Sequence, residues 1–144
     1  MERLLDGSLS EAPSFLLARA NARSLAQGNA ALVPLKLKVR SYAVLALACG
    51  PERPSQKELA QFLRLDPSQV VALVDDLEAQ GLVERTTDQA DRRTKVVVAT
   101  DIGREREREA RAALDEADTI VFRSLTAAER AALAALLRSV ALDD

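Results

Sequence analysis

The order of local signals between Ser55 and Thr100 constrains this 144-residue chain more than any other feature. Two short helical segments follow each other with a connection of only a few residues. A glycine, Gly81, then separates the second segment from two runs that are rich in β-branched residues. The region therefore predicts a helix, a tight turn, a second helix and a two-stranded hairpin.

The first of these helices is expected to begin at Ser55. Ser55 and Glu58 have the spacing of a capping box, in which the hydroxyl accepts from the third amide and the carboxylate accepts from the cap's amide. Leu59, Phe62 and Leu63 follow at spacings of three and four, which puts them on one helical face. Arg64 and Leu65 then lead to Asp66, so the connection is short, as a helix-turn-helix requires.

The second helix has an equally clear start. Asp66 is the expected cap, Pro67 occupies the first helical position, where its missing amide costs nothing, and Gln69 completes a capping box. Gly81 marks the end of the helix. An apolar side is predicted for four residues: Val70, Leu73, Val74 and Leu77.

The opposite side of this helix carries Ser68, Val71, Ala72 and Asp75. The N-terminal residues of such an outward face can reach base edges in the major groove of DNA. We therefore expect base contacts from Ser68, Gln69, Val71 and Ala72. The alternative is an amphipathic helix whose polar side only meets water.

The runs 82–86 and 95–99 predict a hairpin whose tip contains two aspartates and two arginines. A hairpin in this position is a wing, so the fold class is mostly α with a small β-hairpin wing on a helix-turn-helix core. Arg93 can enter the narrow, negative minor groove, with Asp91 orienting its guanidinium.

Two runs now resemble the MarR family of bacterial transcriptional regulators: residues 65–85, which are similar to its recognition helix and first wing strand, and residues 91–100, which are similar to its wing. The likeness extends over about residues 14–142. It implies a single domain over 1–144, with a winged helix-turn-helix core at 39–100 and a linking helix at 101–120. N- and C-terminal dimerisation helices would occupy 14–33 and 121–142.

In this reading the chain is a sequence-specific DNA-binding transcriptional regulator, a repressor that acts as a homodimer. Ala72 stands where the family often has arginine and Val71 where a small hydroxyl residue is frequent, which predicts an operator unlike those of many relatives. The expected DNA-binding residues are Ser55, Gln56, Lys57, Pro67, Ser68, Gln69, Val71, Ala72, Asp91, Arg92, Arg93 and Lys95.

Helical patterns flank the core on both sides. Gly28 weakens the last turns of the first, and Thr100 is the expected cap of a helix in which residues 104–109 form a solvated, ion-paired stretch. A last helix begins with a capping box at Thr126 and Glu129. The apolar stripe of this last helix could pack on its own domain or on a second copy of the chain. The resemblance implies a homodimer through residues near 15–25 and 121–142.

Composition disfavours several other classes of function. The chain has no histidine, no glycine-rich phosphate loop and no Cys/His metal cluster, so we expect neither an enzyme nor a cofactor. No segment predicts a membrane span or an export signal, and the lone Cys49 fits a reducing compartment, which indicates the cytoplasm.

The net charge of −2 gives DNA binding little support. Residues 33–100 hold ten Lys and Arg against nine Asp and Glu, and residues 101–144 hold seven Lys and Arg against ten Asp and Glu.

Many relatives release DNA when a small aromatic or phenolic ligand binds. The resemblance implies Arg19, Arg23, Arg40 and Tyr42 as ligand-binding residues here, against the alternative of surface arginines and a core tyrosine.

Cys49 is expected to fill apolar space, with oxidant sensing as the alternative. The competing function for the whole chain is a winged-helix module that binds protein without specific DNA binding.

Overall fold

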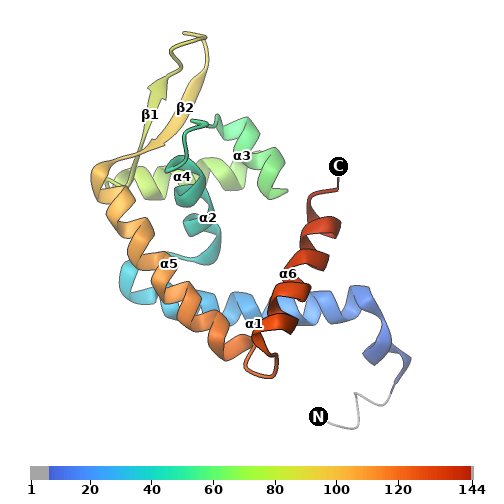
Figure 1. Ribbon diagram of the computed structural model, residues 1–144. Coiled ribbons are helices and arrows are strands. Elements are labelled where there is room, and N and C mark those ends of the chain that lie inside the picture. The colour runs from blue at the N-terminus through green and yellow to red at the C-terminus, as the bar shows by residue number, and fades with distance from the viewer. Residues whose placement is uncertain (1–6, 144) are drawn as a thin grey trace. The chain divides into compact units, whose positions relative to one another are not determined.

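The computed structural model describes residues 7–143, which form two compact units. One unit comprises residues 28–114 and contains the helix-turn-helix and the wing; the other combines the described residues up to 27 with residues 115–143. Figure 1 labels the helices and strands. The elements are η2 (Ser8–Glu11), α1 (Pro13–Leu32), η3 (Val33–Leu35), α2 (Val39–Ala48), α3 (Gln56–Leu63), α4 (Pro67–Ala79), β1 (Val83–Thr87), β2 (Lys95–Ala99), α5 (Asp101–Val121) and α6 (Ala127–Ala141).

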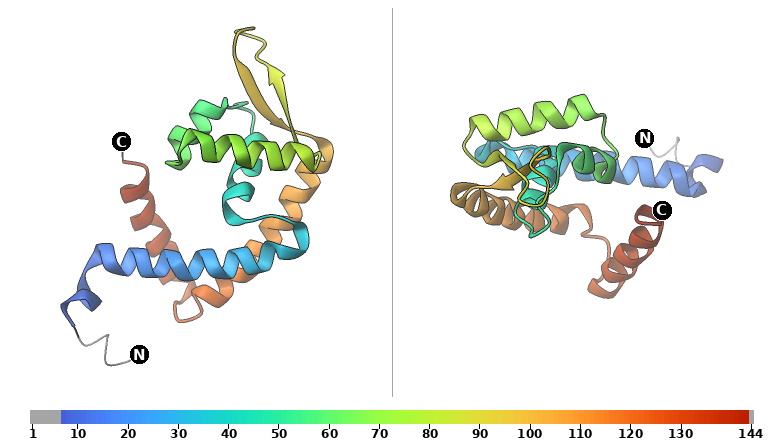
Figure 2. Two further views of the ribbon diagram at one scale, coloured as in Figure 1. Left: turned by 180° about the vertical axis from the view of Figure 1, so that it is seen from behind. Right: turned by 90° about the horizontal axis from the view of Figure 1, so that it is seen from above.

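The 28–114 unit has one hydrophobic core, to which α2, α3, α4 and the root of the hairpin all contribute. The predicted apolar side of α4 is confirmed, because Val70, Val74 and Leu77 are fully buried and Leu73 packs against them. The hairpin extends beyond the helices of this unit (Figure 2). The largest fully buried side chains are Leu32, Val44, Leu45, Leu59, Val70, Val74, Leu77, Leu82, Val83 and Val97.

The predicted capping boxes are present at the starts of α3, α4 and α6. In α3, the amide of Glu58 donates to Ser55 Oγ at 3.3 Å, and the amide of Ser55 donates to Glu58 Oε2 at 2.8 Å. Asp66 and Gln69 make the corresponding pair in α4. Local sequence thus places each helix start within its first turn.

Phe62 shares the helical spacing of Leu59 and Leu63 but not their burial. Leu59 is buried and Leu63 is half-buried, but the ring of Phe62 is 63% exposed although it shares their spacing. α3 has only eight residues, and its buried contacts are made by Leu59 and Ala60. Phe62 lies at the edge of this contact face.

The wing is an antiparallel pair in which Val83 lies opposite Ala99 and Thr87 lies opposite Lys95. Gly81 precedes it with a φ of 71°, a left-handed conformation that glycine adopts without strain. The middle of β2 is also joined to the segment before α3, because the amide of Val97 donates to the carbonyl of Pro54 at 2.8 Å. The wing is therefore fixed to the helix-turn-helix through β2.

The start of α5 confirms the predicted cap, since the amide of Gly103 donates to Thr100 Oγ1 at 3.0 Å. Gly103 also allows close packing: a Cβ there would lie 1.9 Å from the carbonyl oxygen of Leu82. The expectation of a solvated 104–109 stretch is wrong for Glu107, whose side chain is 6% exposed. Its Oε1 accepts from Arg111 Nη2 at 2.7 Å and from the Tyr42 hydroxyl at 3.3 Å.

Gly28 has a different role from the one its sequence position suggests. α1 continues past it without a break to Leu32, and Gly28 itself is buried. A Cβ at this position would lie 2.7 Å from Val39 Cγ2 and 3.1 Å from Leu114 Cδ2. The glycine therefore lets α1 approach the start of α2 and the middle of α5 closely.

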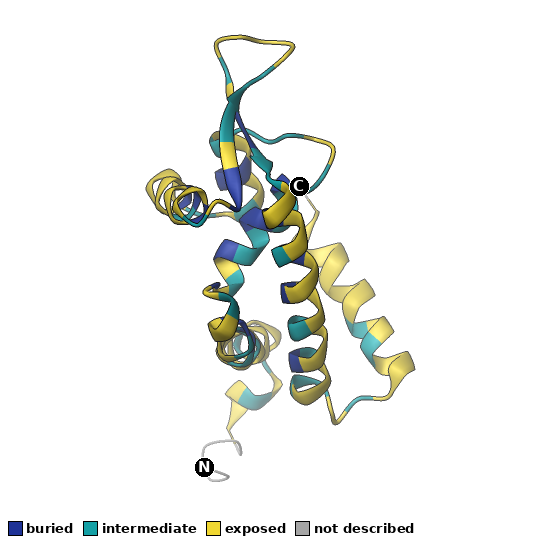
Figure 3. Cartoon of the chain, turned by 90° about the vertical axis from the view of Figure 1, so that its left-hand side faces the viewer, coloured by how far each residue is buried: buried dark blue, intermediate teal, exposed yellow. Residues whose placement is uncertain are grey.

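The unit built from residues 7–27 and 115–143 differs in its burial. Most of α6 is exposed, including Leu136, Leu137 and Val140, and no α6 residue is buried (Figure 3). Leu16 and Leu17 on α1 are also about half exposed. In the part of the chain that the structure describes, no helix is long and apolar enough to cross a membrane.

Candidate nucleic-acid interface

The outward face of α4 is built from its first two turns. Ser68, Gln69, Val71 and Ala72 are all exposed, and Val71 keeps 40% of its surface accessible. The buried residues of α4 fix the helix with this face turned away from the core. The structure thus presents a small, mixed polar and apolar surface of the size that enters a major groove.

The cap of α4 determines which of its groups are free. The amide of Ser68 donates to Asp66 Oδ1 at 2.8 Å, and the amide of Gln69 donates to the carbonyl of Asp66 at 3.0 Å. The hydrogen bonds from the hydroxyl and amide of Ser68 hold the pKa of Asp66 below its ordinary value. Contacts from this end of α4 to another molecule must therefore come mainly from side chains.

α3 contributes the residues at its N-terminus. Ser55 is the cap, and Lys57 projects into solvent. Gln56 is half-buried, and its Oε1 accepts two hydrogen bonds from Arg85, so only its amide NH₂ group remains to donate to a phosphate. Ser55 also lies opposite Val96 of the wing, which places the start of α3 beside β2.

The tip of the wing is a polar turn organised by Asp91. Its Oδ1 accepts from the main-chain amide of Arg93 at 3.0 Å, and its Oδ2 accepts from the Thr94 hydroxyl at 3.1 Å. We expected Asp91 to hold the Arg93 guanidinium, but within residues 7–143 the carboxylate bonds only to the backbone and to Thr94. Arg92 and Arg93 are fully on the surface, and Lys95 Nζ donates to Thr87 Oγ1 at 3.0 Å.

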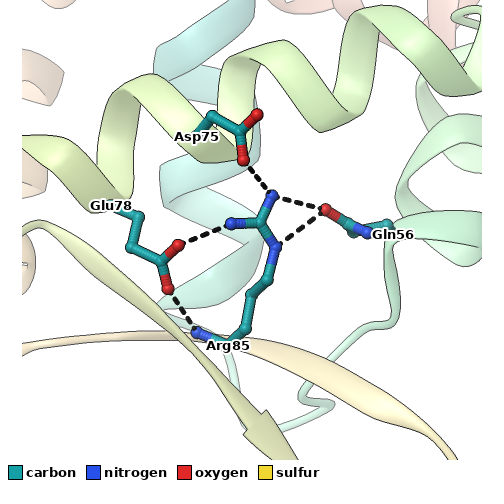
Figure 4. A network of polar contacts seen from close by, with 4 residues as sticks. All are labelled: Gln56, Asp75, Glu78 and Arg85. Atoms are coloured by element: carbon teal, nitrogen blue, oxygen red, sulfur yellow. Dashed lines mark hydrogen bonds and ion pairs between the residues drawn. The ribbon is translucent and has the colours of Figure 1, made fainter.

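Arg85 is a site residue that the sequence analysis did not single out. It lies on β1, and its guanidinium bonds to Gln56 of α3 and to Asp75 and Glu78 of α4 (Figure 4). A signal was present, because strand alternation puts residue 85 on the same face as the buried Val83. A cation on an inward face needs acceptors, and the preceding helix supplies them.

The four residues expected at a ligand site fall in both units. Arg23 on α1 lines a cavity of about 300 Å³ with Ala26, Gln27, Ile120 and Val121, all within the 7–27 and 115–143 unit. Arg19 is also on this part of α1 and is exposed.

Arg40 and Tyr42 belong to α2 in the other unit. The Tyr42 hydroxyl donates to Glu107, and burial, followed by the Glu107 charge, raises the pKa of the phenol. Burial and then Glu107 likewise raise the pKa of Cys49, which disfavours its thiolate. Among the described residues, no three His, Cys, Asp or Glu side chains are grouped to hold a metal ion.

A helix-turn-helix whose second helix presents an exposed face, followed by a hairpin with a basic tip, defines the winged-helix class of DNA-binding proteins. The chain belongs to the MarR family of transcriptional regulators. A model of the MarR family matches residues 38–94, which run from the start of α2 to the tip of the wing. The expected family and fold class are both confirmed.

Solved structures extend this likeness over nearly the whole chain. A MarR-family transcriptional regulator from Rhodococcus sp. RHA1 is 41% identical with a TM-score of 0.85, over 93% of this chain and 98% of that chain. CouR from Rhodococcus jostii RHA1, solved with p-coumaroyl-CoA bound, is 42% identical with a TM-score of 0.84, over 94% and 96%. A repressor also named CouR, bound to a 23-mer DNA duplex, is 29% identical with a TM-score of 0.84, over 94% and 96%. Among curated protein sequences, none gives a significant match.

Proposed function

We propose that this chain is a sequence-specific DNA-binding repressor that acts as a homodimer. The observation that carries the proposal is the exposed face of α4 beside a wing that ends in Arg92 and Arg93. The N-terminal residues of α4 would read base edges in the major groove. The wing arginines would enter the adjacent minor groove, where the potential is most negative.

The charges near this surface are suited to phosphate contacts. Lys57 at the start of α3 and Lys95 at the edge of the wing are exposed cations, and Ser55, two residues before Lys57, lies opposite Val96 of β2. Phosphate contacts position a protein on the duplex without reading its sequence. Discrimination between sequences would then come from four side chains: Ser68, Gln69, Val71 and Ala72.

The apolar surface of the 7–27 and 115–143 unit supports the homodimer. Leu136 and Val140 are 67% and 71% exposed, although they lie one turn apart on the same side of α6. Exposed apolar stripes of this kind mark protein interfaces. A two-fold dimer through this unit would present two copies of α4 to half-sites about one helical turn of DNA apart.

We further propose that an aromatic ligand releases the protein from DNA. The CouR structure from Rhodococcus jostii RHA1 holds p-coumaroyl-CoA, an aromatic acyl thioester with several phosphates. In this chain Arg23 lines an otherwise largely apolar cavity, so it would pair with an anionic group of such a ligand. Arg19, four residues earlier on α1, is a further proposed contact. Arg40 and Tyr42 are the second pair of proposed contacts.

Fluorescence anisotropy tests the DNA-binding proposal directly. A labelled duplex from the region upstream of the protein's own gene is compared with a scrambled duplex at several salt concentrations. We expect wild type to prefer the upstream duplex, and Arg93→Ala to weaken that binding about ten-fold and to reduce its salt dependence by about one released ion. The matched control is Arg108→Ala, which removes an exposed arginine from α5.

Two results would contradict the proposal. Absence of DNA binding at low salt would favour the alternative of a protein-interaction module. Equal effects of Arg93→Ala and Arg108→Ala would remove the wing from the interface.

Thermal unfolding with p-coumaroyl-CoA and a panel of aromatic acids tests the ligand-binding proposal, because a compound that binds only the folded state raises the midpoint temperature of unfolding. An unchanged midpoint throughout the panel would contradict it.

A working DNA-binding repressor of this family would act in the cytoplasm, where bacterial chromosomal DNA lies.

A further inference from the structure

Arg85 connects the three elements of the DNA-reading surface. Its Nε and Nη2 atoms donate to Gln56 Oε1 at 3.1 and 2.9 Å, which joins β1 to the first residue of α3. Its Nη2 also donates to Asp75 Oδ1, and its Nη1 donates to Glu78 Oε2, both at 2.5 Å. These two bonds join the same strand to two residues of α4 that lie about one turn apart (Figure 4).

The backbone reinforces the connection. The main-chain amide of Arg85 donates to Glu78 Oε1 at 3.1 Å, so Glu78 holds both the side chain and the strand itself. The Arg85 side chain is 23% exposed, which makes it the most enclosed member of its two ion pairs. A planar guanidinium bound on three sides has a fixed orientation, and most of its hydrogen atoms are already in use.

The position of Asp75 makes this arrangement informative. Asp75 lies three residues after Ala72 and seven after Ser68, so it follows them along the outward face of α4, and its side chain is 62% exposed. A carboxylate on a face that meets phosphates opposes binding through its charge. The bond to Arg85 therefore explains the presence of Asp75 on this face better than a contact with DNA does.

We propose that Arg85 is a positioning residue that sets the angle between the recognition helix α4 and the wing. Through Asp75, Glu78 and Gln56 it holds the base-reading side chains of α4 in register with Arg93 at the wing tip. Its contribution is to discrimination between DNA sequences, and its charge is neutralised within the protein. This inference rests on the proposed function of the chain as a sequence-specific DNA-binding protein.

The sharpest test removes the two acceptors together. Asp75→Asn with Glu78→Gln deletes two negative charges beside the proposed DNA surface, so electrostatics alone predicts tighter binding to every duplex. The positioning role predicts that binding to the preferred duplex weakens, and that the ratio of preferred to scrambled affinity falls at least ten-fold. Binding to the scrambled duplex is expected to stay equal or to increase.

A second variant separates positioning from charge. Arg85→Lys keeps the positive charge but cannot form the planar fork that joins Gln56, Asp75 and Glu78. We expect it to lose discrimination to a similar extent while the salt dependence of binding stays unchanged. If Arg85 instead met a phosphate, Lys would preserve binding, and Arg85→Met would reduce the salt dependence by about one released ion.

The probe is a duplex that wild type enriches from a random library, measured against its scrambled counterpart by anisotropy. Glu84→Gln is the matched control, because it removes one charge from the neighbouring, exposed position of β1. Thermal unfolding identifies variants that have lost their fold, and the single substitution Gln56→Ala is a milder break of the same network. Its expected effect is a smaller loss of the affinity ratio, of about three-fold.

The possible failures are distinguishable. If wild type enriches no sequence, the proposed function is overturned and the positioning role falls with it. If wild type enriches a sequence and the folded variants keep the wild-type affinity ratio, only the positioning role of Arg85 is overturned. Tighter binding of the Asp75→Asn, Glu78→Gln protein to the enriched duplex, or full retention of discrimination by Arg85→Lys, would have the same consequence.

Discussion

α4 and α6 begin with the same kind of signal and meet different environments. Both start with a capping box, and both carry apolar residues at helical spacing. In α4 three of these residues are fully buried within the 28–114 unit, whereas α6 has no buried residue and Val140 is 71% exposed. An amphipathic pattern thus shows that one face of a helix is apolar. It does not show whether that face packs against the same chain or against another one.

The largest loss of stability is expected in α4, whose apolar face packs within its own unit. Leu77→Ala should reduce the free energy of unfolding by about 2–5 kcal/mol, because a fully buried Leu leaves a cavity in a close-packed core. Denaturant unfolding at two protein concentrations would measure the loss. Leu136→Ala on the exposed stripe is the comparison, and an equal loss in both variants would contradict the contrast between the helices.

The proposed dimer depends on the stripe of α6. Leu136→Asp with Val140→Asp should weaken self-association about a hundred-fold or more, because it would bury charged groups in an apolar interface. Sedimentation equilibrium measures the change. Ala131→Asp, on the opposite side of α6, is the control and should leave association nearly unchanged. A double variant that self-associates like wild type would place the interface elsewhere.

A smaller effect is expected at the helix caps, which depend on local structure. Thr126→Ala should cost about 1 kcal/mol of local stability, because the amide of Glu129 loses its acceptor at 3.2 Å. Hydrogen exchange in the first turn of α6 would show the change. Thr126→Ser keeps the acceptor and should behave like wild type. Unchanged exchange rates in the alanine variant would mean that the cap does not hold this turn.

The smallest effect concerns pH. Hydrogen bonds from Ser68 lower the pKa of Asp66, and hydrogen bonds from Thr126 lower the pKa of Glu129. Because the folded-state pKa is below the unfolded value, the stabilisation is fully present above the ordinary carboxylate pKa of about 4 and is lost as the pH falls through the lowered folded value. NMR titration should give depressed values in both helices. A depressed value in α4 alone would mean that the cap of α6 requires tertiary support.

Some site residues followed from sequence, and others did not. The exposed face of α4 was predictable because helical periodicity assigns Ser68 and Val70 to opposite sides. Arg85 was not recognised although strand alternation puts it on the face of Val83, and Glu107 was missed because it lies in a charged run that reads as solvated. Their burial depends on which elements pack against them. Asp91 was assigned the right neighbourhood but the wrong partner, because the turn geometry directs its carboxylate to the backbone amide of Arg93.

The sequence by itself determined the local starts and ends of α3, α4, α6 and the hairpin, because caps, glycine and alternation act over a few residues. It also indicated the family, through runs whose order is characteristic. Only the tertiary structure decided that Gly28 and Gly103 are points of close packing, that Phe62 stays exposed and that Arg85 joins three elements. These features depend on contacts between residues that are far apart in the chain. A local sequence pattern does not specify which of those residues come into contact.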